Sequence, residues 1–226
     1  MTLPHGIEWA ALAASYLLGA VPFGWVLVKL VRGIDLRAVG SGNIGATNAM
    51  RVLGKPLGLL AFFLDFAKGL VPVLVLAPWA DPPADELLSL RILCGAAAVC
   101  GHVWPVWLRF RGGKAVATGC GALIAIDPWI FVAGGLGWLA AMALFRMAGL
   151  ASMVMGLVFP LAAWWRASSG AYGYEVVWGT MALFLLILVR HRSNMARMLA
   201  GTEPRVGRGE KARPSSGAGE GTGAGS

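Results

Sequence analysis

Residues 40–51 form a segment rich in glycine and small polar side chains that ends in an arginine. They read G-S-G-N-I-G-A-T-N-A-M-R and lie between two long apolar stretches. Unshielded backbone N–H groups, hydroxyl and amide donors, and a guanidinium are the groups that bind phosphate oxygens. The segment therefore predicts a phosphate site at a membrane surface. The residues expected to contribute are Ser41, Gly42, Asn43, Gly45, Thr47, Asn48 and Arg51.

A second polar cluster reads G-H-V-W-P-V-W-L-R-F-R-G-G-K over residues 101–114. Gly112 and Gly113 allow the backbone to approach a ligand closely, and Lys114 then offers a point charge to an anion. The two arginines before them are interpreted as anchors at the membrane surface. The glycine pair and the lysine therefore predict a second anion-binding loop.

Two histidines accompany these clusters. His102 fits a general base, a donor that orients a ligand, or a histidine that caps a helix end, and the spacing does not choose among them. His191 begins a third cluster, R-H-R-S-N at residues 190–194. It stands three positions before Asn194, so the two side chains share a helix face. The arginines of this cluster are interpreted as ordinary basic residues beside a membrane.

Charged residues also occur inside an apolar run. Asp65 and Lys68 are three apart and can pair on one helix face. Ionisable groups at membrane depth are costly and usually face a bundle interior or a polar cavity. A structural ion pair and a part in the site are both open at this point.

Several common catalytic signatures are absent from the sequence. It contains no H-E-x-x-H, no phosphate-binding loop with its Lys-Ser/Thr, and no G-x-S-x-G. The three cysteines lie in apolar surroundings and are interpreted as buried thiols. We therefore expect no metal or cofactor, and direct transfer between two bound substrates without a covalent enzyme intermediate.

Composition indicates what must position these groups. The 226-residue chain is 58% hydrophobic and only 13% charged, with a mean hydropathy of +0.70. These values predict an all-α integral membrane protein with about seven transmembrane helices, or five if two short runs do not cross fully. The net charge of +8 lies at the ends of apolar segments and does not indicate a nucleic-acid partner. The apolar runs are 8–31, 56–77, 87–108, 115–127, 128–146, 150–166 and 175–190.

Charges in the connections alternate between basic and acidic along the chain. Basic connections are retained on the cytoplasmic side, so the N-terminus is expected outside and the C-terminus in the cytoplasm. All three polar clusters then lie on the cytoplasmic face, and only Arg166 breaks the pattern among the short connections. Residues 1–203 are expected to form one membrane domain. Residues 204–226, rich in Gly, Ser, Pro and charge, are expected to be a disordered tail.

The three clusters resemble the motifs of the bacterial membrane family of acyl-phosphate:glycerol-3-phosphate acyltransferases. The likeness runs from about residue 10 to 203 and includes R-H-R-S-N-M-A-R-M-L-A-G-T-E and F-F-L-D-F-A-K-G. It implies transfer of a fatty acyl group from acyl phosphate to the 1-hydroxyl of glycerol 3-phosphate, giving lysophosphatidic acid and phosphate. The resemblance also implies a place in phospholipid synthesis at the bacterial plasma (inner) membrane, among membrane lipids. The resemblance does not fix the oligomeric state, and it is compatible with a monomer.

The resemblance assigns roles to individual residues. Ser41, Arg51 and Lys114 would bind phosphate groups and stabilise charge that develops during transfer. Backbone N–H groups of residues 42–45 and 112–113 would add donors. Thr47, His191 and Asn194 would position the substrates. Either His102 or a substrate phosphate oxygen would accept the proton of the hydroxyl.

The sequence departs from the family pattern at two places. Ala115 stands where the family usually has a glycine after G-G-K. Gly149 replaces the first serine of a serine-rich motif, which leaves Ser152 as the remaining hydroxyl expected to contact substrate.

Two other functions compete with the enzyme. A membrane anion or phosphate transporter would also use basic residues and glycine-broken helices, but would spread polar groups through the membrane depth. A scaffold or lipid-binding protein would leave Asn43, Thr47, His102 and Asn194 unexplained. The concentration of polar clusters on one face favours an interfacial enzyme.

Overall fold

The computed structural model describes residues 6–207, and all regular elements in this part of the chain are helical. The seven predicted apolar runs all form helices, so the all-α prediction is confirmed. The α-helices are α1 (Gly6–Ala20), α2 (Phe23–Arg32), α3 (Ala46–Leu53), α4 (Lys55–Val71), α5 (Ala77–Trp79), α6 (Leu87–Val103), α7 (Val116–Ile126), α8 (Pro128–Phe145), α9 (Ala148–Ser168), α10 (Glu175–Arg190) and α11 (Arg192–Leu199). Short turns of tighter or wider helix are η1 (Leu36–Ala38), η2 (Pro72–Leu76) and η3 (Val106–Leu108).

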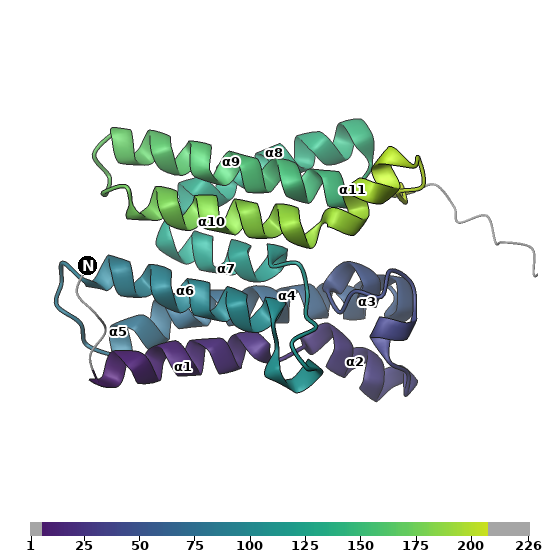
Figure 1. Cartoon of the computed structure of the whole chain (residues 1–226), viewed down its shortest axis with the longest axis horizontal. Helices are drawn as coiled ribbons and strands as arrows, with labels where there is room; N and C mark the ends of the chain where they lie inside the picture. Colours follow the sequence, from purple (N-terminus) through teal and green to yellow (C-terminus); the bar gives the residue numbers. More distant parts are fainter. Residues whose placement is uncertain (1–5, 208–226) are drawn as a thin grey trace, which may run out of the picture.

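The helices form two groups joined by α7 (Figure 1). One group holds α1, α2, α4 and α6, and the other holds α8, α9 and α10. Helix α7 lies between them and packs on α4, α6 and α8. Its central residues, from Thr118 to Leu123, are buried. The connection that carries the Gly-Gly-Lys sequence is therefore attached to the most enclosed helix of the bundle.

Glycines let α7 approach α4 at backbone distance. A Cβ added to Gly69 would overlap the carbonyl of Thr118, and one added to Gly121 would overlap the carbonyl of Phe66. Association of helices in lipid depends on close packing because lipid tails are as apolar as the side chains, so small residues are favoured at contacts. These glycines allow the short distance between α7 and α4.

Five helical segments are long and apolar enough to cross a membrane, and the bent pair of α10 and α11 adds a sixth if it counts as one span. A count of five agrees with the lower of the two predicted counts, and a count of six lies between them. Helix α7 has 11 residues. At about 1.5 Å per residue it covers well under the roughly 30 Å of a hydrocarbon core, so the 115–127 run does not span by itself. The membrane face that each terminus meets stays a prediction from the charge pattern.

The exception to the charge pattern has a local explanation. Arg166, near the end of α9, pairs with Asp127 across 2.7 Å between Nε and Oδ2. Asp127 also caps α8, because its Oδ1 accepts the Trp129 N–H at 2.9 Å. The Arg166–Asp127 pair therefore adds no net positive charge at this end of the bundle.

The packed chain extends a little past residue 203. The Val206 N–H donates to the Arg146 carbonyl at 2.7 Å, and Arg146 Nε donates back to the Val206 carbonyl at 2.9 Å. The predicted tail thus begins as a segment held against the α8–α9 junction. Its remainder, residues 208–226, lies outside the described residues.

Candidate active site

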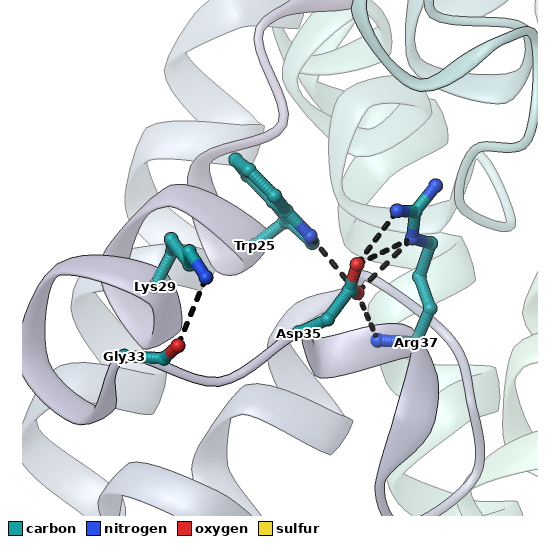
Figure 2. A network of polar contacts seen from close by, with 5 residues as sticks. All are labelled: Trp25, Lys29, Gly33, Asp35 and Arg37. Carbon is teal, nitrogen blue, oxygen red and sulfur yellow. Dashed lines mark hydrogen bonds and ion pairs between the residues drawn. The ribbon is translucent and has the colours of Figure 1, made fainter.

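The chain enters the first polar cluster through a network at the end of α2 (Figure 2). The Asp35 carboxylate accepts hydrogen bonds from the Trp25 indole at 3.0 Å and from the backbone and guanidinium of Arg37. Lys29 Nζ donates a hydrogen bond to the Gly33 carbonyl at 2.9 Å, at the C-terminal end of α2. The hydrogen bonds from Arg37 hold the pKa of Asp35 well below its usual range. This network fixes the start of the loop 36–45.

Asn48 braces the same loop from inside. Its Oδ1 accepts the Ser41 N–H at 3.0 Å. Its Nδ2 donates to the carbonyls of Leu36, Val39 and Asn43 at 3.0–3.2 Å. The side chain is buried and all of these contacts are to backbone. The structure therefore gives Asn48 the task of shaping the loop, in place of the predicted contact with phosphate.

The exposed positions of this cluster are different residues. Ser41 and Thr47 are exposed, and so is Arg51 one turn further along α3. Asn43 turns its Oδ1 back to the Gly45 N–H at 2.8 Å, and the Gly42 N–H donates to the Val39 carbonyl at 3.0 Å. The two glycine N–H groups that were expected to face a phosphate are thus engaged within the loop, because the turn needs them to close.

The Gly-Gly-Lys loop folds back on the end of α6. The Gly112 N–H donates to the Val103 carbonyl at 3.1 Å, and the Gly113 N–H donates to the His102 carbonyl at 3.0 Å. The expectation that these two N–H groups bind phosphate therefore does not fit the geometry. The glycines serve close packing, because a Cβ on Gly113 would overlap the His102 ring.

Arg190 contacts the second loop, which the sequence did not predict. Its Nε donates to the Gly113 carbonyl at 3.0 Å and its Nη2 donates to the Gly112 carbonyl at 2.8 Å. Its interpretation as an ordinary basic residue beside the membrane was wrong for this position. Only its place next to His191 within the third cluster distinguished it from an anchor.

Lys114 belongs to a chain of polar contacts. Its Nζ donates to Asn194 Oδ1, and Asn194 Nδ2 donates to Glu203 Oε1 at 2.6 Å. Glu203 also pairs with Arg197 at 2.8 Å. Helix α11 and the segment after it therefore hold the ammonium that the α6–α7 connection presents.

Several cations converge around Lys114. Burial, and then the neighbouring charge of Arg197, lower the pKa of Lys114 from 10.5 to about 8. Arg190 and Arg51 act in the same direction, while Glu203 opposes them. Three positive side chains from other parts of the sequence thus act on Lys114, and Glu203 is the one carboxylate that opposes them. Such a concentration of positive charge favours an anion.

The two histidines are both buried. His191 Nδ1 lies 2.9 Å from the Ile187 carbonyl, which can only accept, so Nδ1 carries the proton. His102 is enclosed beneath Gly113, and its Nδ1 lies 3.9 Å from Asp65 Oδ1. Burial of His102 disfavours its predicted role as a base that meets a substrate hydroxyl.

Gly149 faces the polar chain around Asn194. A side chain at this position would crowd the Asn194 amide and come within 3.0 Å of Glu203 Oε1. Ser152 lies one turn along α9, where its hydroxyl donates to the Ala148 carbonyl at 2.9 Å. The departure at Gly149 is thus matched to the space that Asn194 and Glu203 occupy.

Ala115 adopts a left-handed backbone conformation, with φ of 69°. This conformation costs a non-glycine residue about 1–2 kcal/mol. Replacing Ala115 with glycine removes that strain, but it also removes about 0.8 kcal/mol of methyl burial and adds about 0.5–1 kcal/mol of backbone entropy cost. We therefore expect the free energy of unfolding of Ala115→Gly to lie within about 1 kcal/mol of the wild-type value.

Ala115→Val provides the contrast. It places a β-branched residue in the left-handed region at a fully buried position, so a loss of at least about 2 kcal/mol is expected. Thermal unfolding of both variants in detergent measures the difference. Equal stability of the glycine and valine variants would contradict the conformation assigned to this residue.

Metal ligands are not grouped in the described part of the chain. No three His, Cys, Asp or Glu side chains among residues 6–207 lie together in a way that could hold a metal ion. The site consists of cations, amides and hydroxyls toward one end of the bundle, where α3, the connection before α7, and α11 lie (Figure 1). Fold and site together define an integral membrane protein with a group of cationic and polar side chains at one end of its helices.

Comparison with known proteins identifies the family. The glycerol-3-phosphate acyltransferase family profile matches residues 9–201, and the chain belongs to this family. A glycerol-3-phosphate acyltransferase of Anaeromyxobacter sp. (strain Fw109-5) is 44% identical over 198 residues, covering 86% of this chain and 94% of the relative. One from Thermosynechococcus vestitus is 40% identical over 200 residues, covering 85% of this chain and 92% of the relative.

Two solved structures share the fold. The chain is similar to the crystal structure of PlsY, an integral membrane glycerol 3-phosphate acyltransferase, in its glycerol 3-phosphate form. The TM-score is 0.80 at 39% identity, and the match covers 89% of this chain and 96% of that one. The lysophosphatidic acid form of PlsY gives a TM-score of 0.76 at 38% identity, covering 88% and 95% of the two chains.

Proposed function

We propose that this chain transfers a fatty acyl group from acyl phosphate to the 1-hydroxyl of glycerol 3-phosphate. The products are lysophosphatidic acid and inorganic phosphate, as part of phospholipid synthesis at the bacterial inner membrane, with the site toward the cytoplasm. The observation that carries the proposal is the convergence of Lys114, Arg51, Arg190 and Arg197 at one end of a membrane bundle. Both substrates bear phosphate and one bears a lipid tail, which suits a cationic centre beside an apolar surface. The related structures are solved in a glycerol 3-phosphate form and a lysophosphatidic acid form.

The reaction needs no protein nucleophile. The glycerol hydroxyl attacks the acyl carbonyl carbon, a new ester C–O bond forms, and the bond from that carbon to the bridging phosphate oxygen breaks. The hydroxyl proton passes to the departing phosphate, which accepts it readily. His102 is buried, which supports this assignment over a histidine base.

The protein supplies position and charge. Lys114, held by Asn194, neutralises negative charge on the departing phosphate, and Arg51 and Ser41 hold phosphate oxygens from the exposed side of the first loop. The exposed Thr47 would orient a substrate, and the buried His191 and Ser152 would support the edge of the site from behind. Holding two substrates in register makes the attack effectively unimolecular, which accounts for a large part of the expected acceleration.

Arg51→Ala tests how much the first loop contributes to kcat/KM. Arg51 is an exposed side chain in the last turn of α3, so its loss is expected to leave the fold intact. Without the guanidinium, kcat/KM is expected to fall about 10²-fold, the usual cost of one charge-stabilising donor. Phosphate release with palmitoyl phosphate and glycerol 3-phosphate measures the change. Near-normal turnover in a folded Arg51→Ala variant would remove the first loop from the site.

The transporter alternative gives a different result in the same preparation. Purified protein should release phosphate from palmitoyl phosphate only when glycerol 3-phosphate is present. A transporter would instead carry labelled phosphate into proteoliposomes and form no lysophosphatidic acid. Uptake without acyl transfer would overturn the proposed function.

A further inference from the structure

A buried polar cluster lies beneath the two substrate loops and makes no direct part of the cationic centre. Asp65 and Lys68 on α4 pair at 2.7 Å, and each side chain is 1–3% exposed. His102 at the end of α6 stands 3.9 Å from the same carboxylate. An ion pair at this depth is expensive, so it marks a position where the chain gains something besides hydrophobic packing.

Lys68 connects the cluster to the first loop. Its Nζ donates to the Val21 carbonyl at 2.8 Å, at the break between α1 and α2 where Pro22 interrupts the helix. Helix α2 then packs Gly24 directly against the Ile44 carbonyl, since a Cβ on Gly24 would overlap that oxygen. The ammonium therefore fixes the helix against which loop 40–48 rests.

Asp65 and His102 connect the cluster to the second loop. The backbone carbonyl of Asp65 accepts the Thr118 hydroxyl at 3.0 Å, which ties α4 to the first turn of α7. The His102 ring fills the space directly under Gly113, and its Nδ1 makes no hydrogen bond within residues 6–207. The Asp65 carboxylate lies 3.9 Å from that ring nitrogen inside the buried cluster. The ring itself packs under the loop that presents Lys114.

We propose that Asp65, Lys68 and His102 are positioning residues that set the distance between loop 40–48 and loop 112–114. The inference rests on the proposed acyl transfer, because it explains how two phosphate-binding loops on different helices keep one register. None of the three side chains touches substrate in this account. Their effect passes through Val21 to the first loop and through Gly113 to the second.

The test replaces the pair as a unit. Removing one charge strands the other in an apolar interior and destabilises strongly, whereas replacing both with apolar residues of similar volume is often tolerated. The variant is therefore Asp65→Leu/Lys68→Met. Asp127→Asn/Arg166→Met is the matched control, since it removes an ion pair at the opposite end of the bundle.

The expected result has two independent parts. In the Asp65→Leu/Lys68→Met variant, KM for glycerol 3-phosphate rises about tenfold and kcat/KM falls about 10²-fold, as a displacement of roughly 1 Å would produce. Deuterium uptake at residues 40–48 and 112–115 accelerates while the core of α9 stays protected. The control variant keeps the wild-type KM and the wild-type exchange in both loops.

Other outcomes overturn the inference. A folded double variant with unchanged KM and unchanged loop exchange would show that the pair only fills space. If that variant does not fold, His102→Gln replaces the ring under Gly113 with a narrower and more flexible polar side chain, and wild-type exchange at 112–115 in His102→Gln would overturn the proposal. Deuterium uptake needs no turnover, so its result stands even if acyl transfer were not observed.

Discussion

Lys114→Met is expected to lower kcat/KM by a factor of about 10²–10³, the cost of losing a preorganised charged donor. Lys114 is the cation that Asn194 holds in place, and the positive charges of Arg197, Arg190 and Arg51 act on it. Methionine keeps much of the side-chain volume and removes only the charge and its hydrogen bonds. The measurement is steady-state phosphate release at varied glycerol 3-phosphate concentration.

The charge of Lys114 also determines how kcat/KM should depend on pH. The pKa of Lys114 in the free protein is about 8, so the ammonium is present below pH 8 and is lost as the pH rises above it. The basic limb of kcat/KM should therefore fall near pH 8. Bound phosphate favours the charged form and raises the lysine pKa, so the limb of kcat should lie at higher pH. Replacement by arginine should remove the limb near pH 8 in whatever activity remains.

The control for Lys114 lies in the same connection. Arg109 is an exposed basic residue that no contact places in the centre, so Arg109→Met should retain wild-type kcat/KM. Equal losses in Lys114→Met and Arg109→Met would indicate a general electrostatic effect and would contradict a specific role for Lys114.

Gly113→Ala is the second large effect. The added methyl would overlap the buried His102 ring. Loop 112–114 must shift, and Lys114 moves with it. A displacement of about 1 Å at a reacting centre costs about 10²-fold in rate, so kcat/KM should fall by at least that factor.

Gly135→Ala is the matched control for that substitution. Gly135 also lies in an apolar environment of the bundle, within α8, but a Cβ there meets nothing within 4 Å. Alanine has the higher helix propensity, so this variant should be active and slightly more stable. Full activity in Gly113→Ala would show that the glycine pair is not needed for close packing.

Patterns of residue type predicted the fold well because they depend on local chemistry. Apolar runs and their flanking charges predicted the helices, and all seven runs are helical. Span number was harder, because a run such as 115–127 reads as a membrane segment although α7 is too short to cross. Its enclosure by α4, α6 and α8 depends on contacts far apart in the chain, which periodicity does not encode.

The sequence predicted which polar clusters contribute to the site better than it predicted what each residue contacts. Ser41 and Asn48 read alike as small polar groups, yet one is exposed and the other bonds four backbone groups. Arg109 and Arg190 read alike as anchors, yet Arg190 clamps the carbonyls of the glycine pair. In each pair the difference lies in which long-range partners the side chain meets.

The most direct measurement follows the atoms of the donor. Palmitoyl phosphate labelled with ¹⁸O at the bridging oxygen is incubated with the purified protein and glycerol 3-phosphate, and the products are analysed by mass spectrometry. Attack of the glycerol hydroxyl on the acyl carbon should give one labelled phosphate for each lysophosphatidic acid formed, with unlabelled ester oxygens. Label in free palmitate, or phosphate released without lysophosphatidic acid, would contradict it.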